Sequence, residues 1–148
     1  MSRRSYVAEA EIDAPVEEVW AALVDFERYR DWNPFTTEAR TSFEVGRPID
    51  MRVRLSSYGI TISQRETVRA VEPNERIVWG TVMMLGLVRA ERTQTLTALD
   101  GGRTRYRTED VIEGALGGLV HVLMGRSIQT GFDGVAAGLR ERFATADR

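Results

Sequence analysis

Hydrophobic and polar side chains alternate along several segments of the chain, as they do in strands that bury one face. The clearest case is 49–56, where Ile49, Met51, Val53 and Leu55 alternate with Asp50, Arg52, Arg54 and Ser56. The same criterion predicts strands over 6–12, 60–72, 75–82, 88–99 and 102–112. Turn residues separate them at Ser57-Tyr58-Gly59, Pro73-Asn74 and Asp100-Gly101.

Two other parts of the chain follow a helical period. Val16, Val19, Trp20 and Leu23 fall on one helix face, and Pro15 before them suits a first helical turn. Asp13 is the expected cap acceptor, and Asn33-Pro34 should end the short helix that follows. A long helix is predicted over 116–143, with one face made of Gly117, His121, Met124, Gly125, Ile128, Phe132, Val135, Ala136, Leu139 and Phe143.

The expected order is a strand, two short helices, six strands, of which five have the ranges given above, and a long helix. Strands that follow one another through short turns pair in an antiparallel manner, and the helices must then cover one side of the sheet. The fold class predicted from the pattern is therefore α+β.

Three motifs carry a family resemblance: Ala14-Pro15-Val16-Glu17-Glu18-Val19-Trp20, Trp32-Asn33-Pro34-Phe35 and Gly102-Arg103-Thr104-Arg105-Tyr106. Through them the whole chain resembles the START-related helix-grip superfamily, which includes polyketide cyclases/dehydrases, lipid-transfer domains and birch-pollen-type allergens. The resemblance implies a curved antiparallel sheet of about seven strands wrapped around the last helix, with a cavity between them. We expect one ligand-binding domain over 1–148.

Composition narrows the possible functions. The chain has 148 residues, of which 43% are hydrophobic, so it has enough apolar material for a sizeable core. A net charge of −2 argues against nucleic-acid binding, which usually needs a basic face. With no cysteine and one histidine, we expect no metal site and no cofactor. No secretory signal or apolar run long enough to cross a bilayer is found, so a cytoplasmic protein is expected.

Polar residues interrupt the apolar faces of three strands. Alternation places Glu66 with Ile62, Arg92 and Gln94 with Leu96, and Thr108 and Asp110 with Ile112, all toward the concave side. Ionised groups are costly to bury unless they are paired, so one carboxyl group there should have a raised pKa. Such a group could act as a general acid or base. A structural ion-pair network and a one-residue register slip that turns these side chains outward are open alternatives.

His121 is the fourth candidate catalytic residue, as a proton shuttle or a hydrogen-bond donor at the cavity mouth. The alternative interpretation is that His121 is a half-buried side chain with a structural partner and no catalytic role. The many glycines of the last helix either widen a cavity or allow close helix contacts. Residues expected to bind a ligand are Met51, Val53, Leu55, Ile62, Gln64, Trp79, Met83, Gln94, Thr108, Met124, Ile128 and Phe132.

An apolar run, Val82-Met83-Met84-Leu85-Gly86-Leu87-Val88, falls where two strands should turn. Because turns are normally polar, this run could be a lid, a dimer contact or a membrane-touching tip. It could also be two strands that extend and pair in the core.

These observations leave three classes of function. The first is a cavity protein of bacterial type, a monomer or homodimer, that binds a small hydrophobic molecule such as a lipid, polyketide-like or aromatic compound. The second is a polyketide cyclase or dehydratase in which Glu66 or Asp110 is the base, Arg92 stabilises an oxyanion and His121 shuttles protons. The third is a protein-interaction module that resembles activators of a chaperone ATPase, with the Met83–Leu87 tip as its contact.

Overall fold

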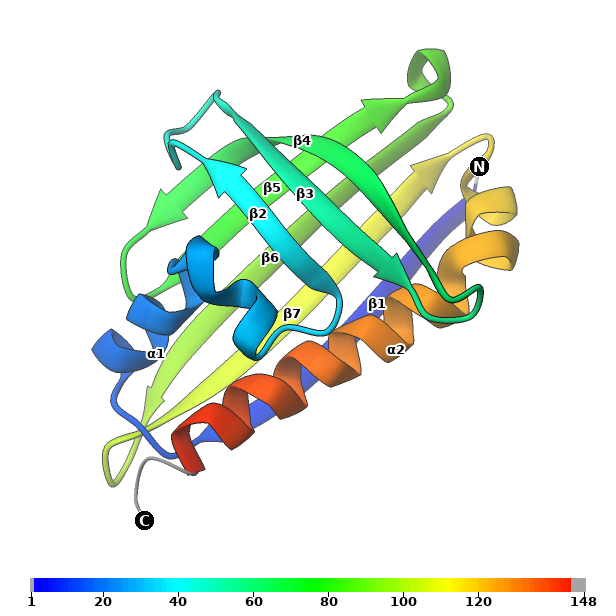
Figure 1. The fold of residues 1–148 in the computed structure, drawn as a ribbon. Helices are drawn as coiled ribbons and strands as arrows, with labels where there is room; N and C mark the ends of the chain where they lie inside the picture. Colours follow the sequence, from blue (N-terminus) through cyan, green and yellow to red (C-terminus); the bar gives the residue numbers. More distant parts are fainter. Residues whose placement is uncertain (1, 145–148) are drawn as a thin grey trace.

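In the described part of the chain, seven strands form one antiparallel sheet that curls around the last helix (Figure 1). The computed structural model describes residues 2–144. The strands are β1 (Ser2–Ile12), β2 (Thr36–Thr41), β3 (Pro48–Leu55), β4 (Ile60–Glu72), β5 (Arg76–Met83), β6 (Val88–Leu99) and β7 (Arg103–Gly114). Their order in the sheet is β1-β7-β6-β5-β4-β3-β2. The α+β helix-grip arrangement expected from the sequence is confirmed.

The helices are α1 (Val16–Leu23), the 3₁₀ helices η1 (Phe26–Asp31) and η2 (Met84–Gly86), and α2 (Gly117–Ala144). Helix α1 begins at Val16, and the carbonyl of Pro15 before it accepts the amide N–H groups of Glu18 and Val19. No side chain caps it, so the expected role of Asp13 is wrong. The extended backbone of Pro15 occupies the N-cap position instead.

The turn after η1 is ordered by one side chain. Oδ1 of Asn33 accepts the backbone N–H groups of Phe35 and Thr36 at 3.0 and 2.9 Å. An asparagine that bonds to its own downstream backbone replaces the hydrogen bonds of a continuing helix. The turn thereby directs Phe35 and Thr36 inward, and both are buried.

On β1 and β3 the alternating pattern correctly predicted which face is buried. Ile49, Met51, Val53 and Leu55 of β3 are buried, and the residues between them are exposed. On β1, Tyr6, Ala8 and Ile12 are buried in the same way. Strand β2 was not assigned a range from the sequence, because Thr36-Thr37-Glu38-Ala39-Arg40-Thr41 has no clear alternation and its pairing with β3 shifts between Thr36 and Glu38.

Helix α2 lies across the concave side of the sheet, within one residue of its predicted bounds at each end (Figure 1). Three of its glycines face the turn after η1. A Cβ atom at Gly131 would overlap the ring of Phe35, one at Gly134 would lie 2.7 Å from Pro34, and one at Gly138 would overlap the carbonyl oxygen of Trp32. At these positions glycine allows close contact between helix and turn and does not widen a cavity.

Candidate functional site

The curled sheet and α2 enclose a cavity of about 240 Å³. Buried side chains such as Val53 and Trp79 line it, whereas two other lining residues, Met84 of η2 and Ser63 of β4, are exposed. The lining residues are Phe35, Thr36, Met51, Val53, Leu55, Ile62, Ser63, Gln64, Glu66, Trp79, Met83, Met84, Val88, Ala90, Arg92, Asp110, Ile112, Val120, Met124 and Ile128.

Arg92 brings a buried cation to this cavity. The residue is 5% exposed, and two neutral side chains accept hydrogen bonds from its guanidinium. Nε donates to Oγ1 of Thr108 at 2.9 Å, and Nη2 donates to Oε1 of Gln94 at 3.4 Å. Gln94 Oε1 also accepts the hydroxyl of Tyr106 at 2.5 Å. A guanidinium has five N–H groups, so these two bonds leave donors that a ligand in the cavity can use.

Three aromatic rings surround the same guanidinium. Its central carbon lies 4.4 Å from the ring centre of Phe132, 5.7 Å from that of Trp79 and 6.0 Å from that of Phe35. Aromatic faces attract a cation, and the attraction is stronger where water is excluded. The rings therefore stabilise the charge of Arg92 and restrict its side chain to one place.

Two carboxyl groups face the cavity near this cation. Burial raises the pKa of Glu66 to about 7, with a further upward contribution from the negative charge of Asp110, against the lowering effect of Arg92. Burial likewise raises the pKa of Asp110 to about 6, although Arg92 opposes the shift. Nε2 of Gln64 donates to Oε2 of Glu66 at 2.8 Å, whereas Oδ1 of Asp110 is buried and has no hydrogen-bond partner among the described residues.

The structure brings together three of the four candidate catalytic residues. Glu66, Arg92 and Asp110 all line the cavity, so the register slip considered from the sequence does not occur. Three of the expected ligand-binding residues contact Arg92 and do not line the cavity. Gln94 and Thr108 accept hydrogen bonds from its guanidinium, and the ring of Phe132 packs against it. The other expected ligand-binding residues line the cavity: Met51, Val53, Leu55, Ile62, Gln64, Trp79, Met83, Met124 and Ile128.

His121 lies elsewhere. It is exposed, so its expected place on the buried face of the last helix is wrong; Val120 beside it points inward and lines the cavity. Its Nδ1 lies 2.6 Å from the hydroxyl of Tyr6, and the two rings stack with centres 5.8 Å apart. A Cβ atom at Gly125 would lie 2.9 Å from that nitrogen, so glycine leaves room for this contact.

Sequence reasoning missed several lining residues. Val88 and Ala90 share the inward face of Arg92 by simple alternation, and Ile112 shares that of Asp110, so the pattern could have found them. Phe35 and Thr36 could not be found in this way, because an irregular turn directs them inward. Met84 and Val120 depend on how η2 and the start of α2 meet the sheet.

A scan against family models matches residues 3–144 to the family described as polyketide cyclase / dehydrase and lipid transport. The chain belongs to this family. None of the curated proteins compared with the chain matches it.

Solved structures share the fold of this family member at low sequence identity. The aromatase/cyclase Zhui from Streptomcyes sp. R1128 is 15% identical, with a TM-score of 0.75 over 99% of this chain and 97% of that one. A protein from Thermus thermophilus, TTHA0849, is 20% identical, with a TM-score of 0.73 over 98% of this chain and 100% of that one. A START superfamily protein from Mycobacterium smegmatis is 19% identical, with a TM-score of 0.69 over 96% and 98%.

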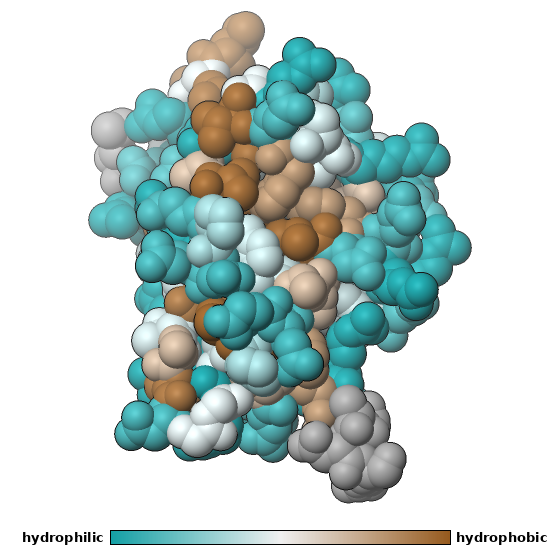
Figure 2. Space-filling view, turned by 90° about the vertical axis from the view of Figure 1, so that its left-hand side faces the viewer, coloured by the Kyte–Doolittle hydropathy of each residue, from teal (hydrophilic) through white to brown (hydrophobic). Residues whose placement is uncertain are grey.

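The apolar run between β5 and β6 forms an uncovered tip, which we define as Met84–Leu87. The strands extend to Met83 and Val88, and Leu85 at the tip is 104% exposed. Figure 2 shows hydrophobic side chains at the top of the molecule, the height at which η2 lies in Figure 1. Met84 and Leu85 have φ angles of 54° and 56°, a left-handed backbone that side chains other than glycine rarely adopt.

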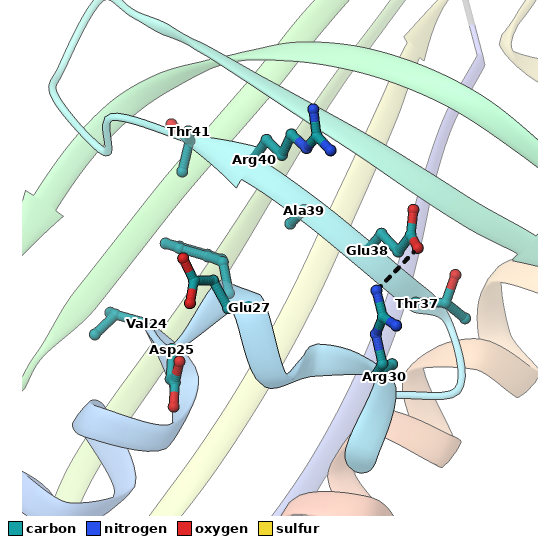
Figure 3. Close-up of a pocket in the computed structure, with 10 residues that line it drawn as sticks. Val24, Asp25, Glu27, Arg30, Thr37, Glu38, Ala39, Arg40 and Thr41 are labelled. Atoms are coloured by element: carbon teal, nitrogen blue, oxygen red, sulfur yellow. Dashed lines mark hydrogen bonds and ion pairs between the residues drawn. The ribbon is translucent and has the colours of Figure 1, made fainter.

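A second hollow lies on the outside of the protein, between η1 and β2 (Figure 3). It is open, and charged side chains surround it, including an ion pair of 3.2 Å between Arg30 and Glu38. None of the candidate residues from the sequence lines it. Among residues 2–144, no helix is long and apolar enough to cross a membrane, and no cluster of three potential metal ligands is present.

Proposed function

We propose that this protein binds a small, largely apolar molecule in the cavity, with a polar group of that molecule directed at Arg92. The observation that carries the proposal is a cationic side chain, buried and fixed by aromatic rings, at the wall of an otherwise mainly apolar cavity. Concave, apolar sites with a few convergent polar groups are the usual form of small-molecule sites.

Two measurements test the proposal. The first is native mass spectrometry after gentle purification, and the second is the binding of a panel of uncharged hydrophobic fluorophores that begins with naphthalene derivatives. A bound mass or a fluorescence change should be lost in Ala90→Phe, because Ala90 lines the cavity and a ring there would fill it. Ala137→Phe at an exposed position of α2 is the matched control. If no compound binds the unaltered protein, the proposal is wrong.

A second candidate function is acid–base catalysis in the same cavity, as in a cyclisation or dehydration of a polyketide-like compound. The observation that favours it is the pair of raised carboxyl pKa values, about 7 for Glu66 and about 6 for Asp110, beside a cation. Groups that titrate near neutral pH suit proton transfer. Asp110, which has the lower pKa, would take a proton from carbon, Arg92 would hold the enolate oxygen, and protonated Glu66 would give its proton to a departing hydroxyl, which leaves as water.

Glu66→Gln and Asp110→Asn test this second candidate. Either change should reduce the turnover of a β-hydroxy ketone substrate by at least about a hundredfold, the usual contribution of one acid or base. His121→Gln should leave turnover unchanged, because His121 is exposed and is not among the residues that line the cavity. Undiminished activity in both carboxyl variants would remove them from the mechanism.

We further propose the setting in which such a protein acts. A net charge of −2 supports a partner that is a small molecule and not a nucleic acid. The chain has no cysteine and so forms no disulfide, which is compatible with a cytoplasmic location. A bacterial origin, action without a cofactor and a monomeric or homodimeric state are part of the same proposal and rest on the family resemblance.

A further inference from the structure

The size of the cavity limits what can enter it. An engineered protein cavity of about 150 Å³ holds one benzene molecule. On that scale a cavity of about 240 Å³ has room for roughly ten heavy atoms, the size of one or two fused rings. A long acyl chain or a four-ring compound would have to leave a large part of its length outside the cavity.

The polar groups of the cavity limit the ligand further. Arg92 offers N–H donors, because its hydrogen bonds to Thr108 and Gln94 use only Nε and Nη2. Asp110, directly opposite Arg92 on β7, also lines the cavity, and its buried Oδ1 has no hydrogen-bond partner among the described residues. A buried polar atom without a partner is costly, and a ligand donor is one way to satisfy it.

Thr36 supplies an independent sign of the same kind. The residue is 1% exposed, it lines the cavity from β2, and its Oγ1 has no hydrogen-bond partner among the described residues. Buried hydroxyl groups normally have a partner. Thr36 and Asp110, two residues that line this mostly apolar cavity, thus each carry a buried polar atom without a partner among the described residues.

Resting on the proposed function, we infer that the ligand is an uncharged compound of one or two rings that presents a hydrogen-bond acceptor to Arg92 and a neighbouring donor to Asp110. Arg92 and Asp110 are cross-strand partners, so an acceptor and a donor close together on one molecule match them. An anionic ligand fits less well, because it would bring a third acidic group beside Glu66 and Asp110.

Titration with 2-quinolone derivatives tests this inference, because their ring amide presents C=O and N–H side by side. We expect 4-methyl-2-quinolone to bind at least tenfold more tightly than N-methyl-2-quinolone, which has the same size but no donor. Naphthalene should bind more weakly than 4-methyl-2-quinolone, and tetradecanoate at least tenfold more weakly. In Asp110→Leu the preference for the N–H compound should fall below twofold, whereas Glu109→Gln, one residue along β7 from Asp110, should keep it.

The outcomes separate this inference from the function on which it rests. If N-methyl-2-quinolone or naphthalene binds as tightly as 4-methyl-2-quinolone, or tetradecanoate binds most tightly, the inference is wrong and the cavity still binds apolar molecules. If none of the four compounds binds, both proposals fail. The comparison of the two methylquinolones uses the unaltered protein, so it remains decisive even if Asp110→Leu does not fold.

Discussion

Arg92 and Asp110 are direct cross-strand partners on β6 and β7, and both line the cavity, yet they do not pair with each other. The guanidinium of Arg92 donates to Thr108 and Gln94, and Oδ1 of Asp110 has no partner among the described residues. The cation and the carboxyl group are therefore both held at the cavity wall, with hydrogen-bonding capacity left over. This arrangement differs from the closed ion-pair network that the sequence also allowed.

Removal of the cation should change the titration of both carboxyl groups. Arg92 lowers the pKa of Glu66 and of Asp110 against the effect of burial. In Arg92→Met we expect the pKa of Glu66 to rise above about 7 and that of Asp110 above about 6. Carbon-detected NMR titration of the carboxyl groups measures this. Arg107→Met, which removes exposed ion pairs with Glu9 and Glu109, should shift neither value.

Glu66 should make the folded state less stable as the pH rises. Its pKa is about 7 in the folded protein against an ordinary value of 4.5, so the folded state binds this proton more tightly than the unfolded state does. The stability that the neutral form supplies is complete below pH 4.5 and is lost as the pH rises through 7. The loss is on the order of 3 kcal/mol.

Glu66→Gln should abolish that loss, because glutamine stays neutral. Urea unfolding should show the variant more stable than the unaltered protein at pH 8, with the difference shrinking toward pH 4. Glu44→Gln, at an exposed site, is the control and should leave the pH dependence as it is. A pH profile of Glu66→Gln that matches that of the unaltered protein would contradict the buried position of Glu66.

Gly138→Ala should destabilise the protein, although alanine favours helices. A Cβ atom there would overlap the carbonyl oxygen of Trp32, and a backbone atom cannot move aside as a side-chain end can. We expect a loss of about 1–3 kcal/mol in the free energy of unfolding, the usual cost of overpacking. Ala137→Gly at the exposed neighbour should lose about 1 kcal/mol through helix propensity alone. A more stable Gly138→Ala would show that α2 does not touch the turn at this point.

Leu85→Gly should stabilise the protein. Leu85 is fully exposed and has a φ of 56°, so glycine removes backbone strain without loss of a buried contact. The free energy of unfolding should rise by about 1 kcal/mol. Leu87→Gly is the matched control: Leu87 has a φ of −77°, which leucine adopts freely, and glycine should lower stability there.

The same position tests whether the Met84–Leu87 tip mediates assembly. Leu85→Glu places a charge at the most exposed point of the tip without disturbing the core. If the tip joins two copies of the chain, the elution volume in size-exclusion chromatography should increase to that of a monomer. An unchanged elution volume would exclude a self-association role for Leu85.

The alternating pattern was sufficient to predict most strands, as the helical period was for the long helix, and alternation placed Glu66, Arg92 and Asp110 on inward faces. This succeeds because a strand has a period of two residues, so one buried side chain determines the direction of its neighbours. The motifs around Pro15 and Trp32 likewise indicated the superfamily. These features depend on residues that are close in the sequence.

Only the tertiary structure decided what the inward side chains contact. Four features depend on how β2, η1 and α2 pack against the rest of the sheet. They are the volume of the cavity, the aromatic rings around Arg92, the unpartnered oxygens of Thr36 and Asp110, and the exposed place of His121. Those contacts join residues far apart in the chain, and the rotation of the helix about its own axis decides whether residue 120 or 121 faces inward. A local pattern specifies the direction of a side chain, but the partners of that side chain are determined by the distant segments that pack against it.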